Sequence, residues 1–174
     1  MNLVAELLQL TIPAGLVLLG MYLAIKAMLE RDFRKQQQEI RHQYSETVIP
    51  IRLQAYERMT LFLERISPNN LLLRMGGQEL TALDLQQLLL REIRDEYNHN
   101  LSQQVYMSQA SWDQIVQAMN EVVALINQAA SEVMPDAPAL DLSKKIFEQV
   151  IQQNNQPVAL ALKVIKEEIQ QTFL

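Results

Sequence analysis

The residues of this chain that could carry acid–base or metal chemistry are few and scattered. The chain has two histidines, His42 and His99, and no cysteine. Glu96 and His99 form an E-x-x-H pair, a spacing that places both side chains on one helix face and occurs in di-iron carboxylate bundles. Such a site needs a second pair and two further glutamates, and the sequence holds a single pair. We therefore interpret His99 as a solvated or helix-ending residue and predict neither a metal site nor a cofactor.

Two adjacent acidic pairs, Asp95-Glu96 and Glu167-Glu168, are interpreted as exposed helix faces, because their spacing does not oppose two carboxylates for acid–base work. The sequence also lacks a zinc spacing of Cys and His, a glycine-rich phosphate loop and a G-x-S-x-G elbow. The tyrosines and Trp112 are predicted to be packing residues. We therefore predict no catalytic residue and a protein that is not an enzyme.

The longest uncharged stretch lies near the N-terminus, at residues 7–25. In a helix these residues rise about 28 Å, which matches the hydrocarbon thickness of a bilayer. We predict an anchor domain at residues 1–29 with a single transmembrane helix over about residues 7–29. The alternatives are a cleavable signal peptide, disfavoured by the acidic N-terminal flank and the missing A-x-A site, and an interfacial helix. Pro13 is compatible with a span because transmembrane helices accept proline.

The charges beside this stretch predict its orientation. Glu6 precedes it, whereas a group of basic residues follows it. Basic residues remain on the cytoplasmic side of a bilayer, so we predict a single-pass protein with its N-terminus outside and its C-terminal body in the cytoplasm. The predicted membrane-interface residues are Tyr22, Lys26, Arg31, Arg34 and Lys35.

Composition and charge define the class of the remaining chain. Four glycines and six prolines among 174 residues favour an all-α protein. Residues 26–65 carry a net charge of +2, from eight basic and six acidic residues, and residues 66–174 carry −6, from seven and thirteen. The acidic distal part disfavours nucleic acid as a partner, since phosphates require a basic surface. Membrane lipid is the partner that the uncharged stretch predicts.

A stripe of apolar positions follows the predicted membrane helix, within a long juxtamembrane helix at residues 30–66. Its steps of three and four residues repeat every eleven, which predicts a nearly straight or slightly right-handed packing surface. Pro50 lacks a backbone N–H, so we predict a kink or break near residues 46–50. The stripe either packs on the protein's own domain or forms an intermolecular seam. This candidate interaction stripe consists of Phe33, Ile40, Tyr44, Val48, Ile51, Met59, Phe62 and Ile66.

Proline, glycine and capping residues divide residues 67–174 into short helices, which we predict to form an acidic bundle. The helix over residues 112–133 has one apolar face, from the three- and four-residue spacing of its large side chains. The fold predicted is therefore all-α, with a transmembrane helix that continues into a cytoplasmic bundle of about five or six helices. The predicted helix starts are Ser67-Pro68, Thr81, Ser108 or Ser111, Asp141 and Pro157, and the clearest predicted loop is MPDAPA at 134–139.

Three segments carry a likeness to known proteins: IPIRLQAYERMTLFLERISPNNLLLRM (49–75), EYNHNLSQQVYMS (96–108) and ALDLSKKIFEQVI (139–151). In these segments, and over nearly the whole chain, the sequence resembles an uncharacterised bacterial family of small, single-span, membrane-anchored all-helical proteins of unknown function. The resemblance implies a location in the bacterial inner membrane. It implies no activity, cofactor or functional residue.

These observations favour a non-enzymatic, membrane-anchored interaction or accessory subunit whose helical body holds a protein partner at the cytoplasmic face. The alternative is a self-associating scaffold or stalk that uses the apolar stripe at residues 33–66 as the seam of a homo-oligomer. A lipid- or ligand-binding helical protein is a third class, for which the sequence contains no positive signal.

Overall fold

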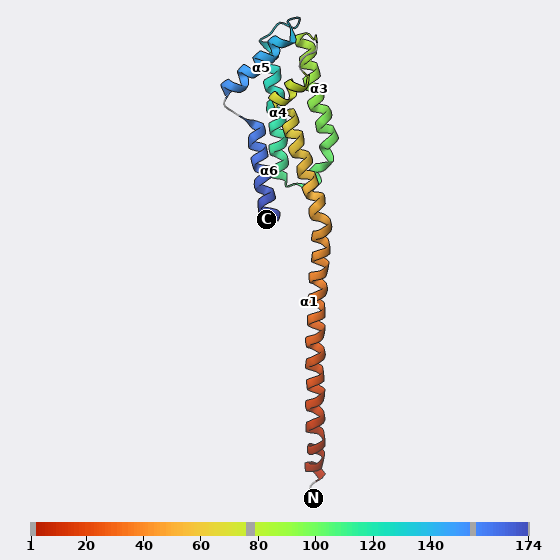
Figure 1. Cartoon of the computed structure of the whole chain (residues 1–174). Helices are drawn as coiled ribbons and strands as arrows, with labels where there is room; N and C mark the ends of the chain where they lie inside the picture. Colours follow the sequence, from red (N-terminus) through yellow and green to blue (C-terminus); the bar gives the residue numbers. More distant parts are fainter. Residues whose placement is uncertain (1–2, 76–78, 154–155, 174) are drawn as a thin grey trace. The chain divides into compact units, whose positions relative to one another are not determined.

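The computed structural model describes the backbone of residues 3–75, 79–153 and 156–173, and for residues 3–11, 14, 41–45 and 153 it describes the backbone alone. The regular structure of these ranges is helical, so the predicted all-α class is confirmed (Figure 1). The elements are α1 (Leu3–Ile66), α2 (Pro68–Met75), α3 (Ala82–Asn100), the 3-10 helix η1 (Leu101–Tyr106), α4 (Gln109–Ser131), α5 (Ala139–Gln153) and α6 (Pro157–Phe173).

The chain divides into two compact units, Met1–Val48 and Ile49–Leu174, and α1 contributes to both. We call the second unit the body. The body begins at Ile49, whereas the sequence prediction placed the start of the bundle at residue 67. The difference arises because the last turns of α1 supply part of the body's hydrophobic core.

The helical backbone of α1 continues through Pro50, and the predicted break of the helix at residues 46–50 is absent. A proline inside a helix removes one backbone hydrogen bond and costs roughly 3 kcal/mol. The turns that follow Pro50 are held by the core, where Tyr56, Met59 and Phe62 are at most 1% exposed. Burial of these large side chains offsets the local cost, since each contributes roughly 1.5–3 kcal/mol.

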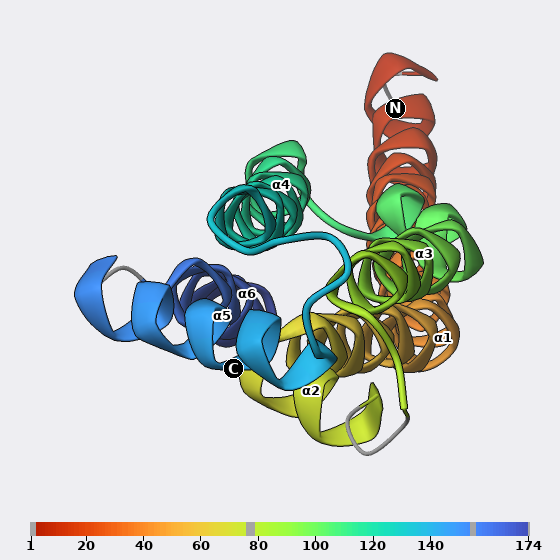
Figure 2. The same cartoon turned by 90° about the horizontal axis from the view of Figure 1, so that it is seen from above.

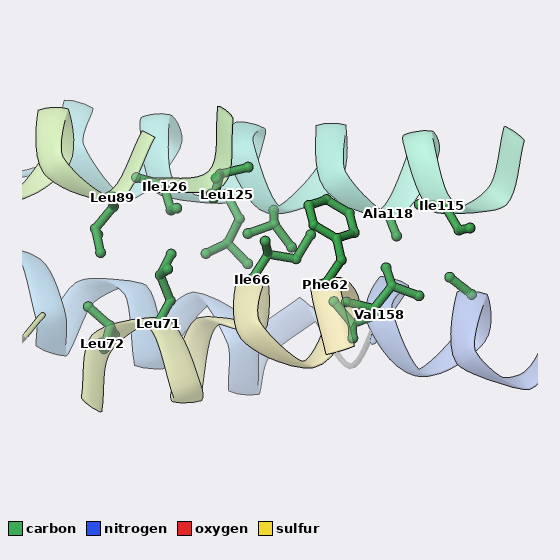
Figure 3. Packing of buried hydrophobic residues seen from close by; sticks show 14 of the residues in the cluster. Phe62, Ile66, Leu71, Leu72, Leu89, Ile115, Ala118, Leu125, Ile126 and Val158 are labelled. Atoms are coloured by element: carbon green, nitrogen blue, oxygen red, sulfur yellow. The ribbon is translucent and has the colours of Figure 1, made fainter. Parts of the chain in front are cut away.

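The core of the body lies between α4 and the helices around it. α4 packs against α3, α5 and α6, and α5 crosses α6 at a steep angle (Figure 1, Figure 2). Phe62 and Ile66 of α1 point toward α4, near Ala118 and Leu125 (Figure 3). The apolar face predicted for α4 is confirmed at four of its large side chains, which are buried: Trp112, Ile115, Val122 and Ile126.

The starts of α3 and α4 are capped by side chains that the sequence indicates. The Thr81 hydroxyl accepts the N–H of Asp84 at 3.1 Å, and the Asp84 carboxylate accepts the N–H of Thr81 at 3.3 Å, which completes a capping box. Ser108, rather than Ser111, caps α4, because its hydroxyl accepts the N–H of Ser111 at 3.2 Å.

Two other predicted caps have different roles. The hydroxyl of Ser67 donates to the carbonyl of Glu64 at 2.8 Å, so this side chain stabilises the end of α1 rather than the start of α2. Asp141 lies within the first turn of α5, which begins at Ala139, and pairs with Lys144 at 3.6 Å. An acidic residue in a first turn still favours the helix, because it faces the positive end of the helix dipole.

An isolated antiparallel bridge joins the segment before α3 to the segment before α5, between Thr81 and Pro138. The N–H of Ala82 donates to the carbonyl of Ala137 at 2.8 Å, and the N–H of Ala139 donates to the carbonyl of Leu80 at 3.0 Å. The predicted loop at 134–139 is therefore tied to the start of a helix more than 50 residues away.

Candidate functional site

The exposed apolar surface of α1 lies in the stretch for which the sequence predicts membrane contact. Leu16, Val17, Leu18 and Leu19 are consecutive and 54–68% exposed. Since successive helical residues are about 100° apart, four such side chains cover the whole circumference of the helix. Every side chain described between Ile12 and Ile40 is exposed.

Within the described ranges, no helix combines the length and the apolar character needed to cross a membrane. The predicted span starts at residue 7, and its side chains at 7–11 and 14 lie outside those that are described. The predicted interface residues Tyr22, Lys26, Arg31, Arg34 and Lys35 are all exposed. Arg34 forms an ion pair with Glu30 at 3.5 Å, one helical turn earlier.

The predicted interaction stripe has a buried part and an exposed part. Its last three members pack in the core of the body: Met59, Phe62 and Ile66. The exposed members are Phe33, Ile40, Val48 and Ile51, and the side chain of Tyr44 lies outside those that are described. Packing on the protein's own domain thus accounts for the C-terminal part of the stripe.

A polar cluster around Glu168 joins several helices of the body, and sequence reasoning missed it. The Tyr56 hydroxyl on α1 donates to Oε1 of Glu168 on α6 at 2.5 Å. Ser108, the cap of α4, donates its N–H to Oε1 at 3.0 Å and its hydroxyl to Oε2 at 2.8 Å. Arg52 donates Nη2 to the Tyr56 hydroxyl at 3.1 Å and Nε to the carbonyl of Tyr106 at 3.0 Å.

The rings beside this cluster complete the contact between α1 and α6. The guanidinium of Arg52 lies 5.1 Å from the ring centroid of Phe173, a distance typical of a cation–π contact. The Phe173 ring meets Tyr56 edge-on, with ring centroids 6.0 Å apart. The side chain of Glu168 is 14% exposed, so the interpretation of this residue as part of an exposed acidic face is wrong.

The electrostatics of the cluster favour one protonation state. Burial raises the pKa of Tyr56 to about 12, and the hydrogen bond to Glu168 acts in the same direction. Burial also tends to raise the pKa of Glu168, but hydrogen bonds from Ser111, Tyr56 and Ser108 outweigh it and lower the pKa below its ordinary value. A neutral phenol facing an ionised carboxylate is a stable donor–acceptor pair, so the arrangement is suited to holding helices together.

The E-x-x-H pair on α3 is part of a surface ion pair. The Glu96 carboxylate accepts two hydrogen bonds from Nη1 of Arg65, at 3.0 and 2.9 Å, and His99 is exposed. Among the residues that the structure describes, no group of three His, Cys, Asp or Glu side chains could hold a metal ion. The side chain of His42 lies outside those that are described.

A cleft of about 250 Å³ lies between α4, α6 and the end of α1. Its walls are mainly apolar, with Val122 and Leu125 from α4 and Val158 and Leu162 from α6; Glu64 is the titratable residue among those that line it. Its volume falls below the roughly 300–1,000 Å³ that small-molecule sites occupy. The cleft is therefore a minor feature of the body's packing.

Comparison with known proteins identifies the family of the chain. A family model described as "Family of unknown function (DUF7935)" matches residues 2–172. No curated protein and no solved structure matches the chain. The match extends over both units, so it includes the exposed apolar segment of α1 as well as the body.

Proposed function

The chain belongs to the DUF7935 family, whose function is unknown, and we propose that it is a membrane-anchored helical subunit of a bacterial inner-membrane complex. In this proposal, α1 enters the bilayer and the body holds a protein partner at the cytoplasmic face. The proposed role is non-enzymatic.

The observation that carries the proposal is the exposed apolar circumference of α1 at Leu16–Leu19. A helix that is apolar on all sides is typical of the interior of a large protein or of a membrane span. The uncharged stretch at residues 7–25 would rise about 28 Å, the thickness of the hydrocarbon layer. Contact with lipid explains why apolar side chains lie on all sides of the helix. It also explains why the uncharged stretch matches the thickness of the hydrocarbon layer.

The proposed orientation is supported by the exposed basic residues that follow the uncharged stretch. Lys26, Arg31 and Lys35 are exposed, and in the charge rule for membrane proteins such residues remain in the cytoplasm. Glu6 on the other side has little influence, because acidic residues contribute weakly to this rule.

The proposal of a binding role rests on how the body uses its polar groups. In the cluster of Tyr56, Glu168 and Ser108, the pKa values of Tyr56 and Glu168 are perturbed, a feature that often marks active sites. Here each of these groups donates or accepts in contacts between helices. The cluster therefore supports a structural function, and a body fixed beside a membrane is suited to holding another protein.

Membrane fractionation tests the anchor. The full-length protein is expected in the membrane fraction and is expected to resist an alkaline carbonate wash. The double variant Leu18→Arg/Leu19→Arg places two charges at the middle of the predicted span (about residues 7–29), at an insertion cost of roughly 2.5–3.5 kcal/mol each, and is expected in the soluble fraction. Leu73→Arg/Leu140→Arg, at two exposed positions of the body, is the matched control and should remain with the membrane. Wild-type protein released by carbonate would contradict the anchor.

A reporter fusion tests the orientation. A reporter attached after Leu174 is expected to be active in a format that works in the cytoplasm and inactive in one that works in the periplasm. The opposite pattern would overturn the orientation while leaving the anchor intact.

Affinity purification from native membranes in mild detergent tests the binding role. A protein partner that co-elutes in fixed stoichiometry, and is lost when the body is deleted, is the expected result. Recovery of the chain alone in several mild detergents would contradict the role of an accessory subunit.

A further inference from the structure

Three apolar residues of the first unit lie on one face of α1, at the end of the predicted membrane span and just beyond it. Their separations of four and seven residues place them within about 40° of one another around the helix. Phe33 and Ile40 are the large apolar residues among the side chains described from Glu30 to Thr47, and the others are polar. The three residues, here called the exposed stripe, are Leu29, Phe33 and Ile40, with exposed fractions of 65, 64 and 56%.

A helix with an exposed apolar face requires a packing partner. Isolated helices are marginally stable in water, and most helical stability in proteins comes from packing of an apolar face. The side chains described over residues 26–40 and 46–48 are all exposed, so these residues show no such packing. Phe62, which follows Ile40 by 22 residues and lies about 40° from it around the helix, is buried in the core of the body. Where this face of α1 belongs to the body, it is therefore packed.

We propose that a second copy of this chain covers the exposed stripe, in a parallel, in-register pair of α1 helices. The inference rests on the proposed membrane anchor. Two copies held by the same segment have the same direction and the same depth in the bilayer, so their exposed stripes lie at equal heights. Every copy of the chain has the same anchor, so a second copy always presents its exposed stripe in the same direction and at the same height.

The charges next to the exposed stripe are compatible with this pairing. Asp32 and Arg34 flank Phe33 on opposite sides, each about 100° from it around the helix. In a parallel two-fold pair, one flank of a helix faces the opposite flank of its partner, so Arg34 lies on the same side as the partner subunit's Asp32. The ion pair of Arg34 with Glu30 is exposed, and such surface pairs are weak enough to rearrange.

Cysteine crosslinking tests the pair directly, because the chain has no native cysteine. A disulfide forms only where two Cα atoms come within about 7 Å, a distance met by facing stripe positions and not by outward ones. Single variants Phe33→Cys and Ile40→Cys are oxidised in native membranes, with Lys35→Cys and Gln38→Cys as exposed controls away from the stripe. We expect at least about tenfold more crosslinked dimer at the stripe positions than at the controls.

A second variant shows whether the stripe drives the pairing. The crosslink at Leu29→Cys is expected to fall about tenfold when Phe33 and Ile40 are both replaced by Gln, since the apolar contact is then lost. Equal crosslinking at stripe and control positions, or none at either, would overturn the proposed pair. The same membranes are fractionated in parallel, so protein found in the soluble fraction would overturn the anchor as a separate result.

Discussion

One oxygen of Glu168 accepts both the hydroxyl of Tyr56 and the backbone N–H of Ser108, residues 112 and 60 positions earlier in the chain. This single atom connects α6 to α1 and to the start of α4. Because the Glu168 side chain is 14% exposed, few water molecules can replace either donor. The contact therefore helps to hold α6 against α1 and against the start of α4.

Replacing Tyr56 by Phe removes the hydroxyl and leaves the ring in the core. Glu168 then loses a donor and Arg52 loses an acceptor, so the free energy of unfolding is expected to fall by about 1–3 kcal/mol. Denaturant titration followed by circular dichroism in mild detergent measures it. In a double-mutant cycle with Glu168→Gln, the coupling is expected to be about 0.5–3 kcal/mol, and additive effects would contradict a direct interaction.

The raised pKa of the Tyr56 hydroxyl predicts a loss of stability at alkaline pH. The phenol ionises near its ordinary pKa of 10.0 in the unfolded chain and at about 12 in the folded protein. Its contribution to stability is complete below pH 10 and disappears as the pH rises to about 12. The alkaline decrease in unfolding free energy should be smaller in Tyr56→Phe than in the wild type. Equal decreases in the two proteins would show that other groups cause it.

The carboxyl of Glu168 predicts the opposite dependence. Its pKa is lowered in the folded protein by hydrogen bonds that outweigh burial, so its contribution is present above the ordinary carboxyl pKa and is lost as the pH falls through the lowered value. Acid titration of the wild type and of Glu168→Gln checks this expectation. The variant should lose less stability on acidification, and an unchanged profile would contradict the prediction.

Phe62 tests the contribution of α1 to the core. Its side chain is fully buried, and Phe62→Ala is expected to lower the free energy of unfolding by about 3–5 kcal/mol. The adjacent Leu61 is 53% exposed and provides a matched control, for which substitution by Ala should change stability by less than about 0.5 kcal/mol. Similar losses at both positions would show that α1 does not pack in the body as described.

The boundary between the two units predicts which fragments fold. A fragment of residues 49–174 retains the core side chains of α1, including Tyr56, Met59 and Phe62, and is expected to unfold cooperatively. A fragment of residues 67–174 lacks them and is expected to show no cooperative transition. Thermal unfolding followed by circular dichroism distinguishes the two, and a stable shorter fragment would contradict the role of α1 in the core.

The features of the fold that could be predicted from the sequence depend on residues that are close together in the chain. The apolar spacing of α4 and the Thr81–Asp84 capping box are set within one or a few helical turns, where pattern and structure correspond directly. The position of Glu168 was not predictable in this way. An acidic pair within a polar helix usually faces solvent, and its hydrogen-bond donors come from distant parts of the chain.

The stripe on α1 shows a second limit of sequence patterns. Ile40 and Phe62 occupy equivalent positions of one repeat, yet the first is 56% exposed and the second is fully buried. The periodicity indicates that a helix face is suited to packing. It does not indicate whether the covering surface belongs to the same chain, because that depends on where the rest of the chain folds back.

The bridge between Thr81 and Pro138 has a consequence for hydrogen exchange. The first N–H groups of a helix normally lack a partner within the helix and exchange rapidly with solvent. At the starts of α3 and α5, the N–H groups of Ala82 and Ala139 instead donate to carbonyls of the opposite segment. Deuterium uptake at these two amides should therefore be slow and should proceed at matched rates, because one opening event exposes both.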